Sequence, residues 1–279
     1  MSDLKILCDS CCDLSDELAK ELNAERAVPF HIEVGGEYMV DDDNLSVPDL
    51  LKKMKKCTSK MSSACPSPEY WKDVFMKAGG GFAITISGKL SGMYQSAKIG
   101  LEAVRNEVSG FIGHIFDSKS AACGEVLVAY KIRQFEKKGL PFDSVVKEVE
   151  NFISNMKTFF VLDDVSNLVK NGRMSKITGA LVSVLGIKPV LGAKNGEIEL
   201  YGKVRGSSNI AGKLVDTIAE CGRKIDGDEL VITHCNNHSL VEELTKQIND
   251  RFDFGRIMVL ETKGLSSFYA CDKGIILSF

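Results

Sequence analysis

The sequence lacks the features of several large protein classes. Its apolar runs fall short of the ~18 residues that a membrane-spanning helix needs, and its N-terminus has no basic segment followed by an apolar one. Positive charge is not in excess, because the formal net charge is −3, whereas proteins that bind nucleic-acid backbones usually carry a strongly basic face. We therefore expect a cytoplasmic protein with no stable membrane insertion and no nucleic-acid partner.

Histidine and paired cysteine motifs are scarce as well. The chain has four histidines and nine cysteines, and an odd number of scattered cysteines fits reduced thiols better than a disulfide framework. Cys8, Cys11 and Cys12 form one cluster but lack a second CxxC pair, and His234 and His238 lack an obvious third ligand nearby. The sequence therefore predicts no metal site.

Common catalytic signatures are also absent. The chain contains no P-loop, no GxGxxG and no GxSxG motif, and no evident pair of nucleophile and base. These absences favour a carrier with no catalytic residue and no cofactor. The alternative is a hydrolase or phosphotransferase acting on a small phosphorylated substrate, with Arg173 or Arg205 on the phosphate and Asp9 as acid or base.

What the sequence does contain is an alternation of apolar strands and amphipathic helices, which is typical of βαβ units and a parallel sheet. The expected strands are 5–8, 27–34, 37–40, 82–87, 112–116, 158–162, 229–234, 256–261 and 274–279, with a β-rich stretch over 188–204. The expected helices are 13–22, 46–56, 67–78, 91–108, 122–138, 142–157, 166–170, 175–185, 210–220 and 240–252. We predict two lobes, an N-terminal α/β lobe over 1–157 and a C-terminal α/β lobe over 158–279, since the length exceeds that of a typical domain.

The turn Ser87–Gly92 is the most informative segment. It joins an apolar strand to a helix, and a helix N-terminus at the carboxyl end of a parallel strand offers free N–H groups to an anion. Ser91 can donate its hydroxyl to a carboxylate or phosphate, or it can simply cap its own helix. Polar turns at Asp9-Ser10, Ser62-Ser63 and Asp117-Ser118 would support a ligand site if they converge on one crevice.

Basic residues gather in the segments Lys170–Lys176 and Lys203–Gly206. Their arginines, Arg173 and Arg205, suit phosphate or carboxylate recognition because a guanidinium can bind two oxygens at once. The plain alternative is solvated surface charge.

Several segments, in this order, resemble the DegV family of bacterial two-domain fatty-acid-binding proteins, some of which partner a fatty acid kinase. The matching residues are Asp9-Ser10, Asp13-Leu14, Val28-Pro29, Ser63–Pro68, Ile86–Ala97, Asp117-Ser118, Phe159–Asp164, Asn171–Lys176, Ile187–Pro189 and Lys203–Gly206. The resemblance implies a parallel-sheet N-terminal lobe and a mixed α/β C-terminal lobe, with a long-chain fatty acid between them.

The resemblance also implies roles for individual residues. Ser63 and Ser91 would hold the fatty acid carboxylate, Gly92 would contribute backbone, and Arg173 and Arg205 would face the kinase or the head group. Ser63-Ala64-Cys65 stands where many members have threonine-serine-glutamine, and the usual histidine near the C-terminus is absent. Tyr269 can supply a replacement hydroxyl or be a packed aromatic residue.

Overall fold

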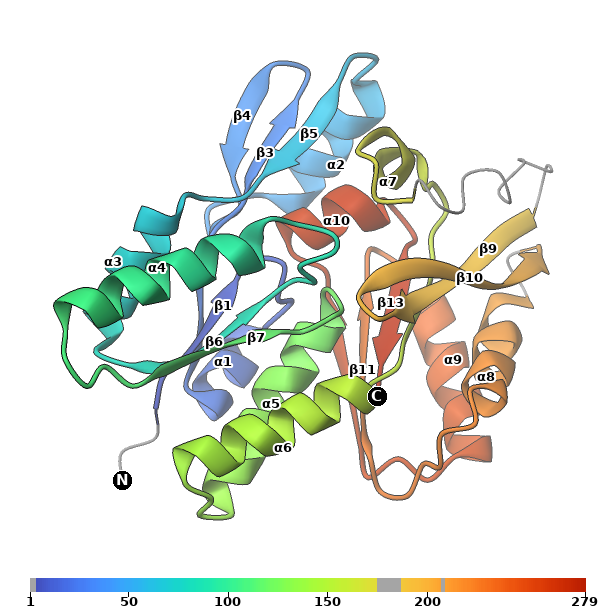
Figure 1. Ribbon diagram of the computed structural model, residues 1–279. Helices are drawn as coiled ribbons and strands as arrows, with labels where there is room; N and C mark the ends of the chain where they lie inside the picture. The colour runs from blue at the N-terminus through green and yellow to red at the C-terminus, as the bar shows by residue number, and fades with distance from the viewer. Residues whose placement is uncertain (1–3, 175–186, 207–208) are drawn as a thin grey trace.

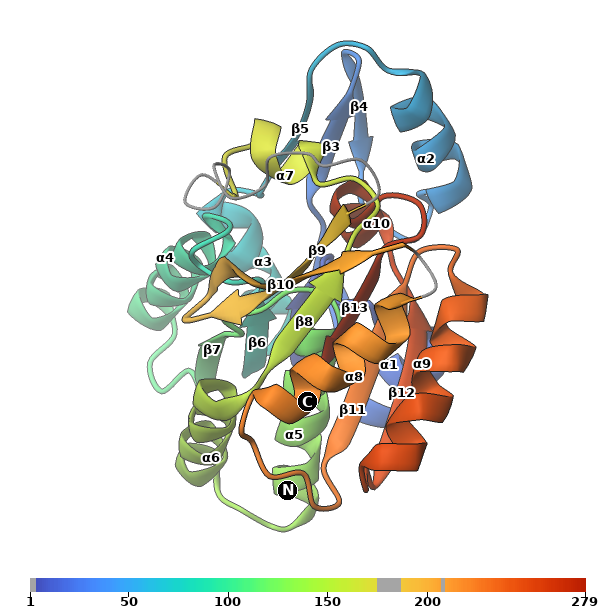
Figure 2. The ribbon, with the colours of Figure 1, turned by 90° about the vertical axis from the view of Figure 1, so that its right-hand side faces the viewer.

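The computed structural model describes residues 4–174, 187–206 and 209–279, which form an α/β protein with three sheets (Figures 1 and 2). The expected helix 175–185 lies outside the described residues. Among the described helices, none combines the length and the apolar character needed to cross a membrane.

The first sheet is parallel and has the order β2-β1-β6-β7. Its strands are β1 (Ile6–Asp9), β2 (Ala24–Val28), β6 (Gly81–Thr85) and β7 (Gly113–Asp117). Successive side chains point to opposite faces, so Ile6 and Cys8 join one apolar cluster and Leu7 joins another. Both faces are therefore covered, as a parallel sheet requires.

Helices supply the two covers. The helices are α1 (Asp16–Leu22), α3 (Pro68–Ala78), α4 (Met93–Glu107), α5 (Cys123–Lys137) and α6 (Phe142–Asn155). Helices α3 and α4 pack together over the face that includes Leu7, whereas α1, α5 and α6 contribute to the cluster on the opposite face (Figure 1).

A small antiparallel sheet extends from the first half, with the order β4-β3-β5. It consists of β3 (His31–Val34), β4 (Glu37–Val40) and β5 (Met61–Ala64), beside α2 (Val47–Lys56). The pair Gly35-Gly36 between the expected strands 27–34 and 37–40 predicts a hairpin, and β3 and β4 form one at this position. The sequence predicts a polar loop over 57–66, but this segment contains β5. The expected strand 27–34 is also wrong, because it is divided between β2 and β3 in different sheets.

The second half forms a six-stranded mixed sheet with the order β10-β9-β8-β13-β11-β12. Its strands are β8 (Thr158–Val161), β9 (Ile187–Lys194), β10 (Glu197–Arg205), β11 (Glu229–His234), β12 (Arg256–Glu261) and β13 (Ile275–Ser278). Its helices are α7 (Ser166–Lys170), α8 (Ile210–Glu220), α9 (His238–Arg251) and α10 (Gly264–Ala270). Helices α8 and α9 pack against its outer face (Figure 2).

The two halves share apolar contacts. Helix α5 packs against β6 of the first sheet and against β11 and β13 of the second, and the same cluster contains Ile6, Val231 and Met258. Helix α10, which the sequence did not indicate, places Leu265 and Phe268 in the core of the first half. The predicted boundary at residue 157 falls between α6 and β8, and the division into two domains stays a prediction.

The start of α1 differs from the sequence-based expectation. The side chain of Ser15 caps this helix by accepting a hydrogen bond from the Leu18 N–H. The sequence predicts Asp13 as the cap of this helix, but Asp13 is fully buried and accepts a hydrogen bond from the Lys263 N–H instead. This residue therefore links the first half of the chain to the segment preceding α10.

Gly100 permits the close packing of α3 on α4, which gives a test of the fold. A Cβ atom at Gly100 would lie 2.7 Å from both the Pro68 carbonyl oxygen and the Trp71 Cβ. We expect Gly100→Ala to lower the free energy of unfolding by about 1–3 kcal/mol through overpacking, as measured by urea denaturation. Gly212→Ala in α8 is the matched control, because the added Cβ would meet only Gln247 Oε1 at 3.6 Å. Equal stability of the two variants would contradict this account of the packing.

Candidate ligand-binding site

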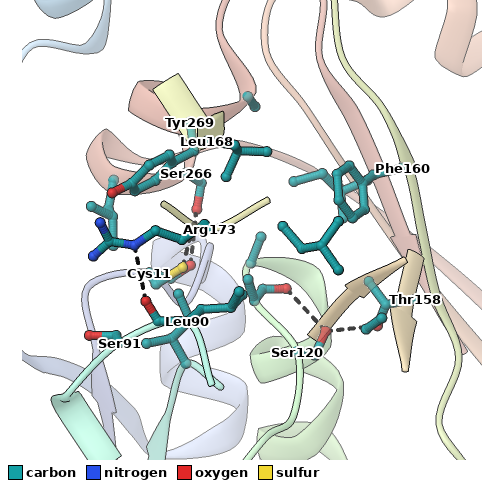
Figure 3. A pocket seen from close by; sticks show the side chains of 18 of the residues that line it. Cys11, Leu90, Ser91, Ser120, Thr158, Phe160, Leu168, Arg173, Ser266 and Tyr269 are labelled. Atoms are coloured by element: carbon teal, nitrogen blue, oxygen red, sulfur yellow. Dashed lines mark hydrogen bonds between the residues drawn. The ribbon is translucent and has the colours of Figure 1, made fainter. Parts of the chain in front are cut away.

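A pocket lined by residues of both halves of the chain is shown in Figure 3. The space between its walls is about 830 Å³, including the part open to solvent. Most of its wall is apolar. The apolar lining residues include Phe30, Ile86, Leu90, Phe160, Leu162, Leu168, Ile198, Leu265 and Ile276.

A group of polar side chains lines one side of this pocket. Ser63, Ser91, Arg173 and Tyr269 all belong to the lining, and Figure 3 shows Ser91, Arg173 and Tyr269 on the side opposite Phe160 and Thr158. They come from β5, the turn before α4, the segment after α7, and α10. The fold therefore gathers four of the six predicted site residues around one cavity.

Tyr269 connects two of these residues. Its hydroxyl is 2.8 Å from the Ser63 hydroxyl, and the Arg173 guanidinium lies 5.9 Å from the centre of its ring. Burial raises the pKa of Tyr269 above its usual value, although the Ser63 hydrogen bond and the nearby arginine act in the opposite direction. The phenol thus remains protonated near neutral pH and can donate a hydrogen bond to an anion.

The backbone holds Arg173 in place at the pocket. Its Nε donates to the Leu90 carbonyl oxygen at 3.1 Å, and its Nη1 donates to the Asn171 carbonyl oxygen at 2.6 Å. No carboxylate of the described residues lies within ion-pair distance of this guanidinium. Its positive charge is therefore available to an anionic group in the pocket.

The turn Ser87–Gly92 has a different internal arrangement from the expected helix cap. Gly92 occupies the N-cap position of α4 and is exposed, while the half-buried Ser91 accepts a hydrogen bond from the Met93 N–H at 3.2 Å. The Ser91 hydroxyl hydrogen can still be donated, because in this bond the oxygen is the acceptor. Gly92 is not part of the pocket lining.

The hairpin of β9 and β10 closes another side of the pocket through Ala193, Gly196 and Ile198. Ser87 holds the tip of this hairpin, since its hydroxyl donates to the Gly196 carbonyl oxygen at 2.7 Å. Gly196 has φ +83°, and an added Cβ would lie 2.5 Å from Ser87 Oγ. A glycine is therefore required at this turn.

The polar turns do not all converge on the pocket as the sequence suggested. Of the expected hydroxyls, Ser63 lines it, whereas Ser10 is bonded to Asp41 and Ser62 to Glu33. Asp117 accepts backbone N–H bonds from Gly88 and Lys119 instead. These side chains fix local loops.

Hydroxyls that the sequence analysis missed lie elsewhere in the pocket wall. Ser120 and Thr158 line it and are 2.7 Å apart, and Thr158 is 2.9 Å from Ser278. Ser120 follows the polar turn Asp117-Ser118, which was the only sequence signal near it. Thr158 and Ser278 are brought together by the antiparallel pairing of β8 and β13.

Arg205 occupies a separate position. It is exposed at the end of β10 and does not line the pocket. Arg205 is therefore not placed to contact a ligand inside the pocket. Its predicted role toward a kinase stays a prediction.

Comparison with known proteins identifies the family of this chain. A family model described as "Uncharacterised protein, DegV family" matches residues 3–275. The chain belongs to the DegV family. A DegV domain-containing protein of Streptococcus gordonii is 36% identical over 279 residues, covering 99% of this chain and 98% of the relative.

Solved structures of DegV proteins share the fold over almost their whole length. A DegV family protein of Ruminococcus gnavus, refined with vaccenic acid, superposes with a TM-score of 0.94 at 34% identity, covering 99% of both chains. The fatty acid kinase B3 protein of Streptococcus pneumoniae, loaded with linoleic acid, gives a TM-score of 0.90 at 32% identity with the same coverage. The expected fold, with a parallel first sheet and a mixed second sheet, is confirmed.

The bond between Ser63 and Tyr269 joins residues 206 positions apart and can be tested alone. We expect Tyr269→Phe to lower the free energy of unfolding by about 0.5–1.5 kcal/mol, because one partly buried hydrogen bond is lost while the ring remains. Chemical denaturation measures this change. Tyr201→Phe is the control, since the Tyr201 ring packs on Phe159 and its side chain is 38% exposed. An equal loss in both variants would argue against a stabilising Ser63–Tyr269 bond.

Proposed function

We propose that this protein binds one long-chain fatty acid non-covalently and presents its carboxylate to a separate fatty acid kinase. The observation that carries the proposal is the mainly apolar pocket of about 830 Å³ with Ser63, Ser91, Arg173 and Tyr269 gathered at one side. An acyl chain matches the apolar wall, and a carboxylate matches the hydroxyls and the guanidinium.

The acyl chain supplies most of the binding free energy in this proposal. Burying each methylene contributes about 0.8 kcal/mol, so a chain of about fifteen methylenes gains on the order of 10 kcal/mol before the costs of ordering. The head group then needs only to be oriented. Two or three hydrogen bonds from the polar side chains, with the charge of Arg173, suffice for that task.

Relatives support the ligand class and the partner. Vaccenic acid in the Ruminococcus gnavus protein and linoleic acid in the Streptococcus pneumoniae kinase B3 protein are both long-chain fatty acids. The second protein is named as a component of a fatty acid kinase. We infer that phosphoryl transfer to the carboxylate is performed by a partner and that this chain has no chemistry of its own.

The position of Asp9 also favours a carrier. The alternative hydrolase or phosphotransferase would need Asp9 as an acid or base, but Asp9 is fully buried and does not line the pocket. Its two carboxylate oxygens accept hydrogen bonds from the N–H groups of Cys11 and Ile86. This carboxylate therefore has no path to a substrate in the cavity.

Native mass spectrometry of the purified protein tests the ligand class directly. We expect a mass excess equal to one fatty acid, which organic extraction removes and identifies. A protein that is consistently free of acyl lipid, and that takes up neither a saturated nor an unsaturated long-chain acid, would refute the proposal.

Ser91→Ala tests the carboxylate site. Loss of one hydroxyl donor should weaken fatty acid binding by about 1–3 kcal/mol, or roughly 5- to 150-fold in Kd, as measured by competition with a fluorescent fatty acid. Ser154→Ala is the matched control, because Ser154 is exposed on α6 and bonds only within its own helix region. Unchanged affinity in Ser91→Ala would exclude the role given to this hydroxyl.

Substitutions of the two arginines distinguish binding of the fatty acid from presentation of its carboxylate to the kinase. Arg173→Ala should weaken fatty acid binding, because Arg173 lines the pocket, whereas Arg205→Ala should leave the affinity unchanged. With a cognate fatty acid kinase, we expect Arg205→Ala to slow phosphorylation by roughly tenfold through weaker electrostatic association. If Arg205→Ala is phosphorylated at the wild-type rate even at low salt, Arg205 does not face the kinase.

A further inference from the structure

A buried group of acidic side chains and one cysteine lies behind the wall of the ligand pocket. It consists of Asp9 at the end of β1, Cys11 just after it, and Glu125 in the first turn of α5. All three are buried, and one ligand-type atom from each lies within 4.8 Å of the others. Only Cys11 reaches the pocket lining.

Asp9 ties together the two strand ends that form the pocket wall. Its Oδ1 accepts from the Cys11 N–H at 2.9 Å, and its Oδ2 accepts from the Ile86 N–H at 2.8 Å. Cys11 and Ile86 both line the pocket, and Ile86 directly precedes the turn that carries Ser91. The position of this turn therefore depends on the Asp9 carboxylate.

Glu125 poses an electrostatic problem. Its side chain is completely buried, and among the described residues no hydrogen bond reaches either of its carboxylate oxygens, although the nearby Cys11 thiol acts to lower its pKa. A second carboxylate, that of Asp9, lies beside it. Two buried carboxylates at this separation cannot both be ionised without a compensating cation.

Charged groups nearby do not compensate a double negative charge. Arg26 donates a hydrogen bond to the carbonyl oxygen of Ser10, next to Asp9, but its charge is paired with Asp41 and Asp43. The titratable groups around the pair, from β1, the loop after it, α5 and the loop after β4, are Cys8, Cys11, Cys12, Asp13, Asp41 and Cys123. None of these is a cation that could offset a second negative charge; Asp41 raises the pKa of Asp9, whereas the Cys11 thiol acts to lower that of Glu125.

We propose that Asp9 and Glu125 share one proton, held on Glu125 and donated as a hydrogen bond to the Asp9 carboxylate, and that this pair positions the strand ends of the ligand pocket. Asp9 is the better anion because it already accepts two backbone N–H groups. The proton on Glu125 gives this side chain the partner that it otherwise lacks. The positive N-terminal end of the α5 dipole stabilises the single negative charge that the pair retains.

The pKa shifts agree with this arrangement. Burial raises the pKa of Glu125 well above its ordinary value, and the neighbouring Asp9 charge raises it further. Burial also raises the pKa of Asp9 to about 7, while its backbone hydrogen bonds act to lower it. Glu125 is thus the proton carrier at neutral pH, and Asp9 loses its charge on mild acidification.

The raised pKa values have a defined effect on stability. Between the ordinary carboxyl range and pH 7, the folded chain binds more protons than the unfolded chain, so the free energy of unfolding falls as pH rises. Asp13, whose pKa burial also raises to about 7, contributes to the same trend. Only the part due to Glu125 should respond to substitution at that residue.

Glu125→Gln tests the shared proton without any lipid. Glutamine keeps the shape and permanently donates an N–H to Asp9, so the variant should fold and lose part of the fall in unfolding free energy between about pH 5 and 8. Infrared difference spectroscopy at neutral pH should show loss of one protonated carboxyl C=O band. The exposed Glu102→Gln on α4 should change neither the slope nor the band.

Several outcomes would overturn the proposal. They are an unchanged carboxyl band and pH slope in Glu125→Gln, a variant that does not fold, and one equivalent of Zn²⁺ in the purified protein that disappears in Glu125→Gln. The last outcome would mean that a metal ion, and not a proton, joins the two carboxylates.

The positioning role rests on the proposed function and is tested separately. Asp9→Asn removes the charge that holds the Cys11 and Ile86 N–H groups, so a bound fluorescent fatty acid should dissociate about tenfold faster at neutral pH. Dissociation from the wild type should accelerate as pH falls below 7, whereas dissociation from Asp9→Asn should not. The exposed Asp250→Asn should behave as the wild type. Identical pH profiles of Asp9→Asn and wild type would refute the positioning role, while failure of all proteins to bind would refute only the lipid proposal.

Discussion

The hydrogen bonds from Cys11 and Ile86 to the Asp9 carboxylate are the contacts on which the ligand pocket depends most. Parallel strands leave backbone N–H groups unpaired where they end, and these groups must be satisfied when they are buried. One carboxylate satisfies two of them and joins β1 to the end of β6. The turn to α4, and with it Ser91, takes its place from this junction.

The same junction explains why a carboxylate tolerates complete burial in an otherwise apolar region. Asp9 gains two backbone donors, and the proposed proton on Glu125 gives it a third, which together offset part of the cost of desolvation. The pocket wall in front of it is mainly apolar, and its charged lining residues include Lys119, Arg173 and Glu197. The carboxylate that holds the strand ends thus lies behind the wall, whereas Arg173 lies in the wall itself.

Much of the secondary structure could be predicted from the sequence because its strands are short apolar runs between clear helical patterns. Strand β5 escaped prediction because Met61–Ala64 is short, half of its residues are serines and it is not fully buried, so that it is defined by its pairing with β3. Helix α10 escaped prediction because small and aromatic residues over Gly264–Ala270 show no helical alternation of polar and apolar side chains. Its burial on almost every side is a consequence of tertiary packing.

The sequence by itself determined the α/β class, the strand-to-helix turn with Ser91, and membership of a recognisable family, since these follow from local patterns and motifs. Only the tertiary structure decided which polar residues meet. Ser63 and Tyr269 bond across 206 residues, Arg205 lies outside the pocket that contains Arg173, and Glu125 faces Asp9. Such encounters depend on how helices and sheets pack, and packing depends on contacts between residues far apart in the chain.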